Sequence, residues 1–125
     1  MSEPLRGVVV CHGGLAASLV EAVEQITGIR GRLTPVSNSD CDRDALEEHI
    51  AAAIAGAPAV VFVDMPSGSC LFAALHRLHG QPQVRVVTGV NLAMLIDFVF
   101  HPDETPEASA VRALATGERA IRSPG

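Results

Sequence analysis

Short apolar runs alternate along the chain with longer segments in which apolar residues recur every three or four positions. The runs Val8–Cys11, Val60–Val63 and Val84–Thr88 are short and rich in β-branched residues, a pattern typical of strands inside a parallel sheet. Leu33–Ser37 is also expected to be extended, but Pro35 has no N–H to donate and belongs in an edge strand. The alternation of the two patterns predicts an α/β fold.

Five helices are predicted between and after these strands. The first three of them end at a glycine, which readily terminates a helix. Their apolar positions are Leu15, Leu19, Val23 and Ile26 before Gly28, Leu46, Ile50 and Ile54 before Gly56, and Leu71, Leu75 and Leu78 before Gly80. Asn91 is a favourable N-cap for a fourth helix over Leu92–Phe100. Thr105 with Pro106 opens a fifth, which is expected to end at Gly117.

The second helix has two candidate N-caps. Asp44 with Glu47 three residues later matches a capping box, whereas Asp42 could cap the helix instead. Acidic residues are frequent here, at Asp40, Asp42, Asp44, Glu47 and Glu48. We expect them to form a solvated first turn, because nothing in their pattern marks a cation site.

The order of the strands follows from the edge position of the second one. With right-handed crossovers, a doubly wound, mainly parallel sheet of order 2-1-3-4 is favoured, with helices on both faces. A short extended tail, Arg119–Arg122, is expected to follow the last helix. No repeat or linker interrupts the pattern, so residues 1–125 are expected to form a single domain.

Composition narrows the classes of function. The 125 residues carry a formal net charge of −5 and contain no Trp or Tyr, which argues against a nucleic-acid partner. The longest uncharged run, Ile50–Val63, is shorter than the about 20 residues that a membrane span needs. Glu3 precedes any apolar stretch, so no secretory signal is expected and the protein is predicted to be cytoplasmic. Cys11, Cys41 and Cys70 are odd in number and form no CxxC pair, so neither disulfides nor a zinc knuckle is expected.

One pair of residues carries the candidate chemistry. His12 and Asp64 follow the first and third strands, and neighbouring parallel strands bring their carboxyl ends together, where α/β proteins bind ligands. A carboxylate that accepts a hydrogen bond from one ring nitrogen leaves the other nitrogen free as a nucleophile or base. A histidine at a strand end is also often only a structural polar residue, and this alternative stays open.

Candidate anion-binding groups surround the pair. Gly13 and Gly14 open the first helix, and Ser67, Gly68 and Ser69 open the third, so two helix N-termini could direct amides at one phosphoryl group. The chain has no GxxxxGK[ST] motif, which leaves a nucleotide-hydrolysing function without support.

Four segments of the sequence resemble the mannose-type (mannose, fructose and sorbose) IIA domain of the bacterial phosphoenolpyruvate-dependent phosphotransferase system. They are VVVCHGGLAASLVEAVEQITG, VVFVDMPSGSCLFAA, VVTGVNLAML and ALATGERAI, and the resemblance covers essentially the whole chain. It implies a single IIA-like phosphoryl-carrier domain in which His12 accepts a phosphoryl group from the phosphocarrier HPr and passes it to a IIB-type partner. It implies that Asp64 orients the ring and that Ser69 corresponds to the serine of the family's GGSP turn.

The same resemblance implies a C-terminal antiparallel strand that is exchanged between subunits in a homodimer, and contact with a membrane only through partner proteins. Two departures bear on the acceptor protein. GGSP is replaced by Ser67-Gly68-Ser69-Cys70, and NLPML by Asn91-Leu92-Ala93-Met94-Leu95. The downstream acceptor and any transported sugar stay open, and a regulatory module that binds partners with or without phosphorylation of His12 is the alternative.

Other residues could support different chemistry. His76 and His79 have a spacing that can bind a metal, but no third ligand is evident, and a solvated helix face is the more usual arrangement. Cys70 at a helix start could have a lowered pKa and act as a thiol nucleophile, although small cysteines more often only pack. We therefore expect no metal and no cofactor.

Overall fold

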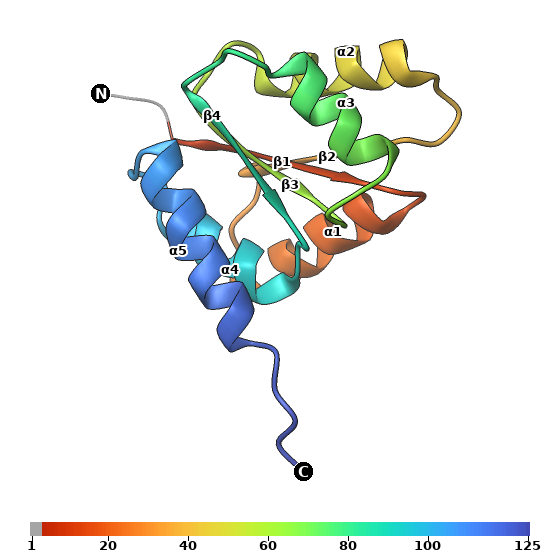
Figure 1. The fold of residues 1–125 in the computed structure, drawn as a ribbon. Coiled ribbons are helices and arrows are strands. Elements are labelled where there is room, and N and C mark those ends of the chain that lie inside the picture. The colour runs from red at the N-terminus through yellow and green to blue at the C-terminus, as the bar shows by residue number, and fades with distance from the viewer. Residues whose placement is uncertain (1–3) are drawn as a thin grey trace.

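The computed structural model describes residues 4–125, and its four strands form one parallel sheet (Figure 1). The strands are β1 (Arg6–Cys11), β2 (Leu33–Ser37), β3 (Ala59–Val63) and β4 (Val84–Thr88). Their order is β2-β1-β3-β4, and all neighbouring pairs are parallel. The predicted order and the edge position of the proline-containing strand are confirmed.

Helices cover both faces of this sheet. On one face lie α1 (Leu15–Thr27), α4 (Leu92–Phe100) and α5 (Pro106–Arg119), and on the other lie α2 (Arg43–Ile54) and α3 (Ser69–Arg77). Figure 1 shows these two layers on opposite sides of the strands. Among the described residues, no helix is both long and apolar enough to span a bilayer.

The two faces explain why the central strands are continuously apolar. In β1, Val9 packs into the cluster beneath α1 and α4, while Val8 and Val10 pack into the cluster beneath α2 and α3. Every residue of β3 is buried in the same way. Since successive side chains of a strand point to opposite faces, a strand covered on both sides needs apolar residues at every position.

The ends of the first two helices follow local rules. Gly28 adopts a left-handed conformation after α1, as expected of a C-cap glycine. Asp42 caps α2, because its side chain accepts a hydrogen bond from the Ala45 N–H at 2.8 Å. This contact decides between the two candidate caps. The helix ends at Ile54, and its C-cap is Ala55, one residue before Gly56.

The C-terminal segment differs from the sequence-based prediction. Helix α5 continues through Gly117 and ends at Arg119, so Gly117 does not stop it. A Cβ at Gly117 would lie 2.6 Å from Cε of Met94, which shows that this glycine permits α5 to approach α4 closely. The predicted strand over Arg119–Arg122 is not seen in this single chain, since Arg119 belongs to α5 and residues 121–125 pair with none of the described strands. In Figure 1 the tail extends away from the sheet.

Candidate functional site

The candidate site lies at the carboxyl ends of two central strands. Val10 of β1 and Val63 of β3 are register partners, and the N–H of Asp64 donates to the Val10 carbonyl at 3.3 Å. His12 and Asp64 are the polar residues that come next on their strands. Strand pairing therefore brings the two predicted residues together, although 52 positions separate them in the sequence.

One oxygen of Asp64 holds His12 at two points. Oδ2 accepts a hydrogen bond from the His12 backbone N–H at 2.9 Å, and it lies 2.8 Å from the ring Nδ1. Because a carboxylate only accepts, Nδ1 donates and Nε2 keeps its lone pair. The His12 side chain is 42% exposed and that of Asp64 is 11% exposed. An imidazole held in this way can act through Nε2 as a nucleophile or base.

The charge of Asp64 is maintained by these contacts. Burial acts to raise the pKa of Asp64, but the hydrogen bonds from the backbone and ring of His12 outweigh it and hold the pKa below its ordinary value. Asp64 is therefore ionised at neutral pH. Its second oxygen, Oδ1, is buried and has no hydrogen-bond partner among residues 4–125.

The predicted phosphoryl-binding residues gather around the ring. An added Cβ at Gly68 would lie 3.8 Å from Nε2 of His12, so this glycine forms the wall opposite the free nitrogen. Gly14 and Gly68 are the N-caps of α1 and α3 and provide no side-chain acceptor. The first-turn amides of both helices thus lack a side-chain cap, and such amides favour an anion. Ser67 and Ser69 are exposed at the same turn.

Asn38 belongs to this site and was missed by the sequence analysis. Its Oδ1 accepts a hydrogen bond from the Gly13 N–H at 3.1 Å, and its Nδ2 donates to Oγ of Ser69 at 3.5 Å. The amide of Gly13 is therefore already engaged, and the side chain of Asn38 links the two glycine loops. A signal existed, because Asn38 directly follows β2, the strand beside β1. The same strand-end rule that selected His12 applies to it.

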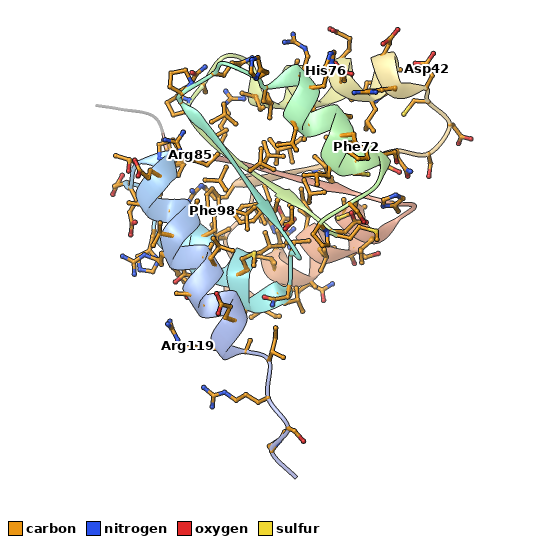
Figure 2. All side chains as sticks on the ribbon, viewed as in Figure 1. Asp42, Phe72, His76, Arg85, Phe98 and Arg119 are labelled. Atoms are coloured by element: carbon orange, nitrogen blue, oxygen red, sulfur yellow. The ribbon has the colours of Figure 1, made fainter. Side chains whose placement is uncertain are left out.

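A cavity of about 400 Å³ opens beside the site, between the starts of α2 and α3. Asn38, Arg43, Ser69 and Phe72 are among the residues that line it. Phe72 is largely exposed, and Figure 2 shows it on α3, with Asp42 at the start of α2. The exposed Ser69 hydroxyl therefore has an apolar neighbour on one side and a basic residue nearby.

The thiols near the pair are not activated. Cys70 is fully buried at the start of α3, with its Sγ 3.8 Å from Nδ1 of His12. Burial and the nearby Asp64 carboxylate raise the pKa of Cys70 to about 11, and the same causes raise the pKa of Cys11 to about 12. Both are neutral thiols at neutral pH. The expectation that a helix start could lower the pKa of Cys70 is wrong, because burial beside an anion dominates.

His76 and His79 do not lie together on one helix, because α3 ends at Arg77 and His79 is in the turn that follows. Nδ1 of His76, which Figure 2 labels on α3, donates to the Glu47 carboxylate of α2 at 2.9 Å, and this contact joins the two helices. Within the described part of the chain, His79 belongs to no cluster of three metal-ligating side chains. His76 therefore has a structural partner instead of a second histidine ligand.

Solved structures share this architecture. The mannose/sorbose-specific IIA subunit of the phosphotransferase system from Enterococcus faecalis is 23% identical, with a TM-score of 0.85 over 98% of this chain and 96% of that chain. The EIIA component from Streptococcus agalactiae is 16% identical, with a TM-score of 0.85 over 95% and 96%. A sigma-54 interaction domain protein from Enterococcus faecalis is 12% identical, with a TM-score of 0.79 over 98% and 96%. At these identities the comparisons show a common fold.

Sequence comparison is more specific about the family. No curated protein matches the chain significantly. The family model described as the PTS system fructose IIA component, EIIA-man, matches residues 7–115. The matched span contains all of the sheet except Arg6, the first residue of β1, and it contains the His12–Asp64 pair. The chain therefore belongs to the EIIA-man family of IIA components of the phosphotransferase system.

Proposed function

We propose that this protein is a cytoplasmic phosphoryl carrier that accepts a phosphoryl group on His12 from an HPr-like phosphocarrier and passes it to a IIB-type partner, in sugar uptake or its regulation. The observation that carries this proposal is the contact between Nδ1 of His12 and Oδ2 of Asp64 at 2.8 Å. Membership of the EIIA-man family supports it. Residues 1–125 would act as one IIA-like domain.

In the proposed reaction, Nε2 of His12 attacks the phosphorus of phospho-HPr in line. The new bond forms between Nε2 and phosphorus while the bond from phosphorus to the donor histidine breaks, and that bond's electron pair stays with the donor. Asp64 keeps the proton on Nδ1 and stabilises the positive charge that develops on the ring. In the second transfer, the phosphoryl group leaves Nε2 of His12 for the acceptor protein through the same in-line arrangement.

The phosphoryl oxygens need fixed donors as the group is transferred. Gly68, the N-cap of α3, lies near Nε2 of His12, and the first-turn amides of α3 that follow it and the Ser69 hydroxyl are the proposed donors. Gly14 at the start of α1 and the Ser67 turn complete the surroundings, while the Gly13 amide acts indirectly through Asn38. No metal or dissociable cofactor takes part in this transfer.

A regulatory role is the second candidate. One structural neighbour is named as a sigma-54 interaction domain protein, and the fold therefore also occurs in a protein whose name refers to regulation. In that role the phosphorylation state of His12 would control binding to another protein. His12 would then accept the phosphoryl group as proposed for the carrier, and only the downstream partner protein would differ.

We also propose a homodimer in which the C-terminal tails are exchanged. Strand β4 is an edge of the described sheet, so one side of its backbone is unpaired there. Ile121, in the tail, is 78% exposed, which leaves an apolar side chain in water within one chain. An antiparallel strand formed by the tail of a second copy would pair with the free backbone edge of β4 and would bury the side chain of Ile121.

The decisive experiment is phosphoryl transfer from phosphoenolpyruvate through enzyme I and HPr. The protein should gain the mass of one phosphoryl group, and His12→Ala should gain none, because the attacking nitrogen is gone. His79→Ala, which removes an exposed histidine in the turn after α3, is the matched control and should be labelled like the unmodified protein. Labelling of a folded His12→Ala variant would reject the proposal.

A further inference from the structure

Three metal-ligating side chains meet at one point of the described chain. The imidazole of His12, the carboxylate of Asp64 and the thiol of Cys70 each offer a ligand atom within 4.8 Å of the other two. They come from the end of β1, the end of β3 and the start of α3. This set, called here the HDC cluster, contains nitrogen, oxygen and sulfur donors, which together suit Zn²⁺ and similar thiophilic cations.

The distances within the HDC cluster fit a shared ion. A tetrahedral zinc ion with bonds of about 2.0 to 2.3 Å holds its ligand atoms about 3.3 to 3.8 Å apart. Sγ of Cys70 lies 3.8 Å from Nδ1 of His12, whereas Nδ1 lies 2.8 Å from Oδ2 of Asp64 because the two share a proton. Replacing that proton by an ion requires the half-exposed His12 ring to move by about half an ångström.

An independent observation also points to a cation ligand at this place. Oδ1 of Asp64 is buried and has no hydrogen-bond partner among residues 4–125, although the carboxylate is ionised. The proposed phosphoryl transfer uses only Oδ2. A buried anionic oxygen without a donor is costly, and a cation held between it and the Cys70 sulfur would remove this cost.

The sulfur donor lies at a turn where this sequence departs from the pattern of the family that it resembles. At the turn that resembles the family's GGSP, this sequence has Ser67-Gly68-Ser69-Cys70, so a thiol stands where the family pattern has a proline. Phosphoryl transfer as proposed above does not use Cys70. The thiol therefore adds a metal ligand beside the His12–Asp64 pair without a role in that transfer.

We propose that His12, Asp64 and Cys70 bind one Zn²⁺-type cation, with the fourth position open to water. Five of the about six waters of the hydrated ion leave as Nδ1, a carboxylate oxygen and Sγ bind, and one water keeps the fourth position. The Cys70 proton passes to solvent, and the ring proton moves from Nδ1 to Nε2. Zn²⁺ is favoured over Mg²⁺ or Ca²⁺, which prefer oxygen ligands only.

Metal binding would act as a switch on the carrier, and this step rests on the proposed function. With Nδ1 bonded to the metal and the proton on Nε2, the nitrogen that attacks phosphorus has no free lone pair. The metal-bound protein would therefore not accept a phosphoryl group. A chelator would restore the reactive tautomer.

The metal site can be tested without any phosphoryl transfer, with Co²⁺ as a spectroscopic probe for Zn²⁺. The reduced full chain should bind one Co²⁺ with a thiolate-to-cobalt charge-transfer band, and Zn²⁺ should abolish the band. Cys70→Ser should lose the band and bind at least about tenfold more weakly. Cys41→Ala is the matched control, because this partly buried thiol lies outside the HDC cluster, and it should keep the band.

Several outcomes would overturn the site. These are a wild-type spectrum without the thiolate band, a band that persists in Cys70→Ser, and binding that is lost in His79→Gln but kept in His12→Gln. If Cys70→Ser does not fold by circular dichroism, His12→Gln takes its place, since this half-exposed side chain can be changed without opening the core. Unchanged Co²⁺ affinity in folded His12→Gln would then reject the proposal.

The switch is tested separately with purified phospho-HPr as the donor. One equivalent of Zn²⁺ should slow labelling of His12 at least about tenfold, and a chelator should reverse the effect. Equal rates with and without Zn²⁺ would overturn the switch. If the protein binds Co²⁺ but is not phosphorylated even when a chelator is present, the carrier function is rejected and the metal site is kept. If the protein is phosphorylated but does not bind Co²⁺, the metal site is rejected and the carrier function is kept.

Discussion

Oδ2 of Asp64 accepts the backbone N–H of His12 at 2.9 Å and lies 2.8 Å from Nδ1 of the same residue. The carboxylate therefore positions the backbone of the loop after β1 and the ring that the loop carries. A single oxygen controls where the histidine is and which of its nitrogens is free.

Changing Asp64 to Asn should slow phosphorylation without abolishing it. The amide oxygen can still accept from His12, but the negative charge that stabilises the protonated or phosphorylated ring is lost. We expect a loss on the order of tenfold to a thousandfold in rate, measured by timed quenching of the transfer from phospho-HPr. Asp97→Asn is the control, because it makes the same change at a largely buried carboxylate on α4. An unchanged rate in Asp64→Asn would disprove the role of the pair.

Changing Asn38 to Ala should slow phosphoryl acceptance by about tenfold, because the two loops that surround the His12 ring lose their shared side chain. Asn38→Asp keeps an acceptor for Gly13 but adds a negative charge near the incoming phosphoryl group, so it should be slower still. Ser39→Ala, the exposed neighbour, should leave the rate unchanged. A rate for Asn38→Ala equal to wild type would show that Asn38 has no positioning role.

Stability should depend on Glu47 at neutral pH and less in acid. The hydrogen bond from His76, on α3, together with Arg43, on α2, holds the pKa of Glu47 below its ordinary value of 4.5. Since the folded-state pKa is lowered, this stabilisation is complete above the unfolded pKa and is lost as the pH falls through the folded pKa. Urea unfolding should show Glu47→Gln less stable than wild type at pH 7, with a smaller difference below about pH 4.

The control for this prediction is Glu48→Gln. Glu48 also faces a basic residue of α3, Arg77, at 3.7 Å, but its side chain is 74% exposed. Exposed pairs contribute little, so this variant should unfold like wild type at both pH values. Equal effects of Glu47→Gln in neutral and acidic solution would mean that its charge does not stabilise the fold.

The proposed strand exchange makes the oligomeric state depend on the tail. At a concentration of tens of micromolar the full chain should sediment as a dimer, because each tail completes the other subunit's sheet. A chain ending at Arg119, the last residue of α5, should sediment as a monomer and remain folded by circular dichroism. A monomeric full chain would reject the exchange.

Local sequence patterns are enough to predict the order of the sheet and the position of the His12–Asp64 pair. Unbroken β-branched runs identify strands covered on both faces, and Pro35 identifies the edge. Those two facts lead to the order β2-β1-β3-β4. The order in turn places His12 beside Asp64, since carboxyl ends of paired parallel strands coincide. Each of these inferences needs only local patterns and chain connectivity.

The side chains that meet around that pair could be identified only from the folded structure. Asn38 bridges two loops, Cys70 is kept neutral by burial beside Asp64, and Gly117 allows a close approach of α5 to Met94 where the pattern predicted a helix end. These outcomes depend on distances between residues far apart in the chain and on how deeply each is covered. The hydrophobic pattern of the sequence shows whether a position is apolar. It does not show which atom from a distant part of the chain will contact that position.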